Sequence, residues 1–178
     1  MRRFRSDKNK APIILLDIDG VLSPMGSMDS LGSGFKLMTF SGFSGSIRYN
    51  PDVVDFFECS HRLGRAEVRW LTSWGEEANL AFGQIGVGPF KTYCEPNGWI
   101  TWWKAQAVQK LLQQSSRRII WVDDQIGDYL EMQPEVRTLV EGHRGRLFTF
   151  CPRPMGGISS HELDEIRRLI LTTNPKEK

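Results

Sequence analysis

The sequence has little that would indicate a membrane protein, a disulfide framework or a nucleic-acid-binding surface. It contains only three cysteines among 178 residues, and no apolar run approaches the ~20 residues of a transmembrane helix. The odd number and wide spacing of Cys59, Cys94 and Cys151 favour free, buried thiols in a reducing compartment. The formal net charge of +2 is too small to indicate nucleic-acid binding. We therefore expect a cytoplasmic protein without a membrane anchor.

Motifs of several common enzyme classes are also missing. The sequence has no serine-centred nucleophile elbow and no glycine-rich mononucleotide loop, which argues against a serine hydrolase and a P-loop kinase. Its histidines, His61, His143 and His161, do not have the spacing of a zinc site. No zinc enzyme is expected.

Short apolar runs alternate with amphipathic stretches along the chain, a rhythm typical of a largely parallel sheet with helices on both faces. We expect strands at residues 12–17, 67–72, 118–123 and 146–150, and a weaker strand at 90–94. Helices are expected to begin at Asn50-Pro51, near Thr101 and after Ser159. The sequence thus predicts an α/β fold class: a three-layer, Rossmann-like domain with about five mostly parallel strands.

A single domain is expected over residues 11–172. Residues 1–10, which carry five Lys and Arg side chains, suit a flexible tail better than a phosphate-binding arm, and residues 173–178 suit a frayed end. In the Gly/Ser-rich stretch after Asp19, residues 35–40 and 46–49 can pair as a β-hairpin flap. Either the glycines of this stretch serve only its turns, or the hairpin acts as a flap that gates access to the acidic residues beside it. No large cap domain fits between the expected strands.

The most informative residues are four aspartates in two sets. Asp17 and Asp19 follow the apolar run 13–16, and Asp124 and Asp128 follow the run 119–122. Open α/β sheets place ligands at the carboxyl ends of their strands, so we expect both sets to meet there. Carboxylates gathered in this way repel each other unless a cation binds, and oxygen ligands suit Mg²⁺. The pattern predicts a magnesium site that handles phosphate.

Lys104 and Thr72 are further candidates for binding phosphate. Lys104 lies in the first turn of an expected helix, where the helix dipole disfavours a cation, so it either neutralises a phosphoryl group or is a surface lysine with a buried stem. Thr72 ends the second expected strand, and its hydroxyl suits a phosphoryl oxygen, with Ser73 as the alternative. Either hydroxyl could instead cap the helix expected at Glu76-Glu77.

These residues occur in the order of the four motifs of the haloacid dehalogenase (HAD) superfamily, which the chain resembles over roughly residues 13–128. The motifs are Asp17-Ile18-Asp19-Gly20-Val21, Thr72 after a strand, Lys104, and the Asp123-Asp124 pair. More narrowly, residues 70–74, 121–124 and 156–161 resemble those of a small capless HAD-like group. Some members of that group are similar to the HAD domain of RNA-repair proteins of the Swiss Army Knife type.

The resemblance implies a magnesium-dependent phosphatase that works through an aspartyl-phosphate. It implies that Asp17 is the nucleophile, that Asp19 is the acid and base, and that Thr72 and Lys104 contact the phosphoryl group. The expected substrate-binding residues are Gly20, Thr72, Ser73 and Lys104. The expected metal ligands are Asp17, Asp19 through its backbone carbonyl, Asp124, and Asp128 as the outer carboxylate, with Asp123 in support.

The expected partner is a phosphorylated substrate. Capless relatives tend to act on large substrates, so the resemblance favours a polynucleotide end or a phosphoprotein. Two alternatives stay open: a nucleotidase acting on mononucleotides, and a noncatalytic HAD-like binding module. Trp74, Trp99 and Trp102 are candidates for the rim of the site, where they would either pack or stack on a base.

Overall fold

A computed structural model describes residues 10–40, 46–93 and 102–172. Its main sheet has five strands in the order β5-β4-β1-β6-β7, and every neighbouring pair is parallel. The strands are β1 (Ile13–Leu16), β4 (Glu67–Trp70), β5 (Lys91–Thr92), β6 (Ile119–Val122) and β7 (Leu147–Phe150). The predicted parallel sheet is confirmed, and its central strand is the first of the five in sequence order.

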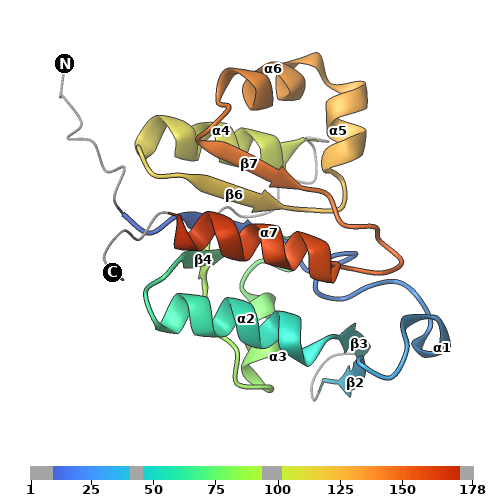
Figure 1. The fold of residues 1–178 in the computed structure, drawn as a ribbon. Coiled ribbons are helices and arrows are strands. Elements are labelled where there is room, and N and C mark those ends of the chain that lie inside the picture. The colour runs from blue at the N-terminus through green and yellow to red at the C-terminus, as the bar shows by residue number, and fades with distance from the viewer. Residues whose placement is uncertain (1–9, 41–45, 94–101, 173–178) are drawn as a thin grey trace.

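Helices cover both faces of this sheet (Figure 1). One face carries α2 (Pro51–Arg62), α3 (Glu77–Gly83) and α7 (Ser160–Leu171), and the other carries α4 (Trp103–Gln114), α5 (Ile126–Met132) and α6 (Pro134–Gly142). In β1, Ile14 and Leu16 pack into the first layer, whereas Ile13 and Leu15 pack into the second. Burial on both faces explains why the strand is continuously apolar. The fold is the predicted three-layer, Rossmann-like α/β fold.

Local sequence signals set the starts of two predicted helices. The Asn50 side chain accepts a 3.0 Å hydrogen bond from the backbone N–H of Asp52, and Pro51 occupies the first turn of α2. Ser159 and Glu162 form the predicted capping box of α7. The helix expected near Thr101 begins at Trp103, and Thr101 lies outside the described residues.

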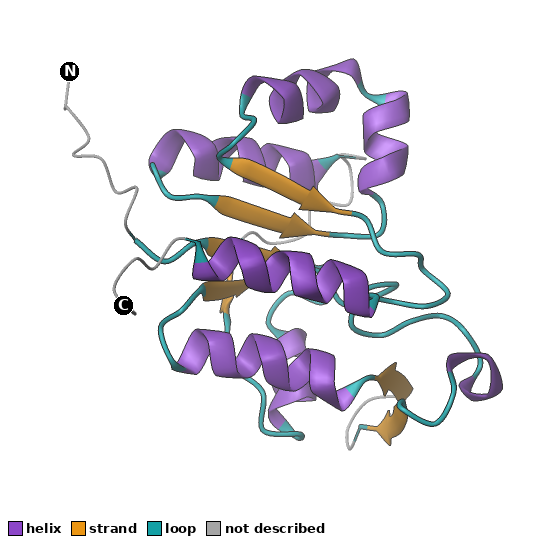
Figure 2. Ribbon diagram, in the orientation of Figure 1, coloured by secondary structure: helices purple, strands orange, loops and turns teal. Residues whose placement is uncertain are grey.

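The predicted hairpin is confirmed as a separate antiparallel pair, β2 (Lys36–Thr39) and β3 (Ser46–Tyr49) (Figure 2). The connecting residues 41–45 lie outside the described part of the chain. Besides this hairpin and α2, the described residues between β1 and β4 form only one short helix, α1 (Met28–Leu31). They contain no large cap domain.

The predictions for the chain ends and the cysteines have different outcomes. Residues 1–9 and 173–178 and Cys94 lie outside the described residues. The free thiols of Cys59 and Cys151 are exposed, so the prediction that they are buried is wrong. Cys59 lies on the outward side of α2, and Cys151 directly follows β7.

None of the helices in the described ranges has both the length and the apolar character that crossing a membrane requires.

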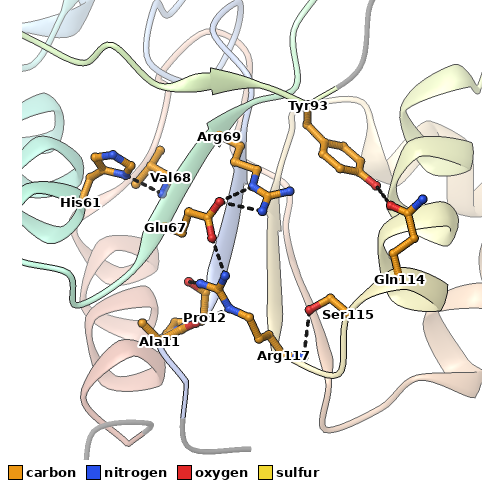
Figure 3. A network of polar contacts seen from close by, with 10 residues as sticks. All are labelled: Ala11, Pro12, His61, Glu67, Val68, Arg69, Tyr93, Gln114, Ser115 and Arg117. Carbon is orange, nitrogen blue, oxygen red and sulfur yellow. Dashed lines mark hydrogen bonds and ion pairs between the residues drawn. The ribbon is translucent and has the colours of Figure 1, made fainter. Parts of the chain in front are cut away.

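A polar network joins the amino-terminal ends of the central strands (Figure 3). Glu67, at the start of β4, accepts a 2.7 Å hydrogen bond from Arg69 and forms an ion pair with Arg117. Arg117 also donates to the carbonyl oxygens of Ala11 at 2.7 Å and Pro12 at 3.3 Å, just before β1. Burial raises the pKa of Glu67, but the two arginines outweigh it and the net pKa is lowered. The network fixes this end of the sheet, opposite to the acidic residues.

Candidate functional site

The candidate site lies at the carboxyl ends of β1, β4 and β6. The ladder of backbone hydrogen bonds continues past the strands: the N–H of Asp17 donates to Val122 at 3.1 Å, and the N–H of Asp123 donates to Phe150 at 3.1 Å. On the other side of β1, the N–H of Leu71 donates to Leu16 at 3.0 Å. Because these bonds hold the backbone beyond each strand, Asp17, Thr72 and Asp123 emerge at one edge of the sheet.

Lys104 joins the two aspartates that end β1 and β6. Its Nζ lies 2.6 Å from Asp17 Oδ2 and 2.8 Å from Asp123 Oδ2, and all three side chains are buried. The lysine comes from the first turn of α4, and its amine points into the protein rather than out to solvent. Burial lowers the pKa of Lys104, but the charges of Asp17 and Asp123 more than compensate, so its net pKa is raised. The amine therefore stays protonated.

Asp17, Asp123 and Asp124 form a carboxylate group with the spacing of a metal site. One oxygen from each lies within 4.8 Å of the others. Burial and the charge of Asp123 raise the pKa of Asp17 to about 6 despite the opposing effect of Lys104, and burial also raises the pKa of Asp123 and Asp124. Lys104 contacts two of these three carboxylates, so ionisation of all three calls for a further cation. An all-oxygen set of carboxylates fits Mg²⁺.

Gly20 allows Asp124 to approach the loop that follows Asp17. Its φ is +70°, and a Cβ placed on it would lie 2.2 Å from Asp124 Oδ2. The loop is tight, with the N–H of Gly20 donating to Ser23 O at 2.9 Å. A residue with a side chain would meet both the strained backbone and the carboxylate. Gly20 thus has a steric role that brings the two acidic segments together.

Thr72 and Ser73 differ in burial. Thr72 is fully buried at the end of β4, and its Oγ1 accepts a 3.4 Å hydrogen bond from the backbone N–H of Trp74. Ser73 is exposed. Neither hydroxyl caps α3, which begins at Glu77 without a capping side chain among the described residues. The choice of Thr72 or Ser73 for binding phosphate stays a prediction.

The remaining predicted aspartates lie outside the three-carboxylate group formed by the described residues. Asp19 is half-buried and accepts a 2.8 Å hydrogen bond from the indole Nε1 of Trp74. Asp128 is exposed in the first turn of α5. Asp123, expected to support the ligands, is fully buried and contacts Lys104. Its position directly after a buried strand was the available signal, whereas no sequence pattern indicated the contact between Trp74 and Asp19.

Comparison with known proteins gave no match for this chain. A scan against protein-family models finds no match, and searches of curated proteins and of solved structures also find none.

Proposed function

We propose that the protein is a magnesium-dependent phosphatase of the HAD type that cleaves phosphomonoesters through an aspartyl-phosphate. The observation that carries the proposal is the buried carboxylate of Asp17 at the end of the central strand, 2.6 Å from Lys104 Nζ and grouped with Asp123 and Asp124. A carboxylate nucleophile, a fixed cation and further oxygen ligands together suit phosphoryl transfer to an aspartate.

The proposed reaction has two steps. In the first, a carboxylate oxygen of Asp17 attacks phosphorus, the bond from phosphorus to the ester oxygen breaks, and Asp19 gives its proton to that oxygen. In the second, Asp19 takes a proton from water, the water oxygen attacks phosphorus, and the bond between phosphorus and Asp17 breaks to release phosphate. Lys104 neutralises part of the negative charge throughout, and Thr72 is the proposed hydroxyl donor to a phosphoryl oxygen.

Asp17, Asp123 and Asp124 are the residues that would hold Mg²⁺. When bound, the ion offsets the charge of the carboxylates and of the incoming phosphate, so that Asp17 is ionised and available for attack. The raised pKa of Asp17 supports this role, because without a further cation part of the population is protonated near neutral pH. We propose an outer position for Asp128, beyond this group.

The proposed substrate is a phosphorylated polynucleotide end or another macromolecule. Its support is the small amount of structure inserted between the strands: α1, the hairpin and α2 between β1 and β4 in the described residues. We propose that a large substrate, rather than an inserted domain, excludes water from the site.

The test is release of phosphate from p-nitrophenyl phosphate, from 3′- and 5′-phosphorylated oligonucleotides and from mononucleotides, with Mg²⁺ or with EDTA. We expect turnover that requires Mg²⁺ and is lost in Asp17→Asn, which keeps the shape of the side chain but removes the nucleophile. Asp29→Asn, an exposed change on α1, is the matched control and should retain activity.

Each outcome has a clear meaning. A preference for oligonucleotides supports the macromolecular substrate, whereas a preference for mononucleotides identifies a nucleotidase. Absence of turnover on every substrate, in a folded protein that binds Mg²⁺, would contradict the phosphatase proposal and favour the noncatalytic binding module.

A further inference from the structure

Trp74 contacts the side chain of Asp19 directly, and neither step of the proposed reaction assigns a role to this contact. Its indole N–H donates a 2.8 Å hydrogen bond to Asp19 Oδ2, across 55 positions of sequence. The backbone of Trp74 is itself held by the turn after β4, where its N–H donates to Thr72 Oγ1 at 3.4 Å. The donor therefore comes from a fixed segment next to the proposed phosphate-binding residue.

Phe40 packs against the ring of Trp74. Phe40 directly follows β2, is only 4% exposed, and lies edge-on to the indole with ring centroids 6.1 Å apart and an interplanar angle of 78°. The indole is thus fixed by its backbone, by an aromatic neighbour at the end of the hairpin, and by its hydrogen bond to Asp19. This arrangement restricts the rotation of both side chains.

We propose that Trp74 is a positioning residue that holds the Asp19 carboxyl group in the orientation needed for proton transfer. This inference rests on the proposed phosphatase function and deepens it. The Asp19 side chain is only half-buried, and a carboxyl group free to rotate would face the leaving oxygen only part of the time. Holding one orientation aligns the proton with the ester oxygen in the first step and with water in the second.

Trp74 acts through Asp19, so its loss should affect substrates according to their leaving groups. An alkyl phosphate releases a strongly basic oxygen that must be protonated as the bond breaks. p-Nitrophenolate leaves readily without a proton. A defect in the orientation of Asp19 should therefore slow the first step for alkyl phosphates far more than for p-nitrophenyl phosphate, a difference that general destabilisation would not produce.

The kinetic test compares Trp74→Phe with Trp70→Phe. The first change keeps an aromatic ring beside Phe40 and removes the N–H that reaches Asp19. The second is a matched control, because the indole N–H of Trp70 also makes a 2.8 Å hydrogen bond, but to Asn79. In Trp74→Phe we expect the single-turnover rate on an alkyl phosphate to fall on the order of tenfold or more, with a small change on p-nitrophenyl phosphate. Trp70→Phe should leave the ratio of the two rates unchanged.

A spectroscopic test does not depend on activity. In ¹⁵N-labelled protein, the indole resonance of Trp74 is assigned by its loss in Trp74→Phe. We expect this resonance to move when Asp19→Ala removes the acceptor, while that of Trp70 stays in place. An unmoved Trp74 resonance, or equal losses on both substrates in Trp74→Phe, would overturn the inference. An inactive parent protein would instead overturn the proposed function, and the resonance would still decide the contact.

Discussion

At the scale of single residues, the site depends on how a few buried charges compensate each other. Lys104 Nζ is within 2.8 Å of two carboxylates, and its side chain is 6% exposed. Burying a charge away from water costs free energy, and in such a group this cost is offset only by the opposite charges of the neighbouring side chains. The lysine is therefore important for stability whether or not a substrate is bound.

Replacing Lys104 with Met should destabilise the protein strongly. The change keeps most of the volume but leaves Asp17 and Asp123 buried without a cation, so we expect a loss of about 3–5 kcal/mol in the free energy of unfolding. Urea denaturation in EDTA measures it. Adding Asp123→Asn to this variant should recover part of the loss, and an equally unstable double variant would contradict the charge argument.

Gly20→Ala should separate backbone strain from displacement of Asp124. Gly64 is the control, because its φ of +66° resembles the +70° of Gly20 but a Cβ there would meet nothing within 4 Å. Both alanine variants should lose about 1–2 kcal/mol of stability from the left-handed backbone. Only Gly20→Ala should also weaken Mg²⁺ binding, measured by calorimetry. Equal affinities in the two variants would show that the Cβ does not displace Asp124.

At the scale of helices and strands, the elements that bury the most residues were the ones that the sequence predicted best. The strands β1 and β6 are buried on both faces, so each appears as an unbroken apolar run. The helices α2, α4 and α7 have a clear apolar stripe, and two of them also have capping signals. The helices α5 and α6 were not predicted, because they are short and bury only two residues and one residue respectively. Such short helices depend on packing against the rest of the protein more than on their own sequence.

The network around Glu67 should make stability depend on pH. The pKa of Glu67 is lower in the folded protein than its ordinary value of 4.5, so its carboxylate stabilises the fold above that value. The contribution is lost as the pH falls below 4.5 and through the lowered pKa. Glu67→Gln should cost about 1 kcal/mol at pH 7, discounted for partial exposure, and almost nothing once Glu67 is protonated. Urea denaturation at pH 7 and at pH 3 tests this, and a cost that does not change with pH would contradict it.

At the scale of the whole molecule, the site joins segments that are far apart in the sequence. The aspartates after β1 and β6 could be placed at one edge because parallel strands align their carboxyl ends. The contacts of Lys104 with two aspartates, and of Trp74 with Asp19, depend on how helices and loops pack across the sheet. The position of Asp128 follows from the direction of α5, which no local signal fixed. Sequence therefore indicated the edge of the sheet better than the contacts made there.

Mg²⁺ should stabilise the folded protein through Asp124 and not through Asp128. At a concentration one hundred times its dissociation constant, an ion that binds only the folded state adds about 2.7 kcal/mol, or about 5–10 °C in Tm for a chain of this size. Asp124→Asn should remove most of this shift, whereas Asp128→Asn should keep it. Thermal unfolding with Mg²⁺ and with EDTA measures both, and loss of the shift in Asp128→Asn would place that residue among the ligands.

The position of β1 at the centre of the sheet has a consequence for synthesis on the ribosome. Strand β1 leaves the ribosome before the other four strands of its sheet and is apolar on both faces. Both of its edges are filled by strands made later, β4 and β6. A nascent chain that has not reached Val122 still has an open edge on Ile13–Leu16, where another chain can pair. We therefore expect that β1 must be kept from pairing with other chains until β4 and β6 have been made.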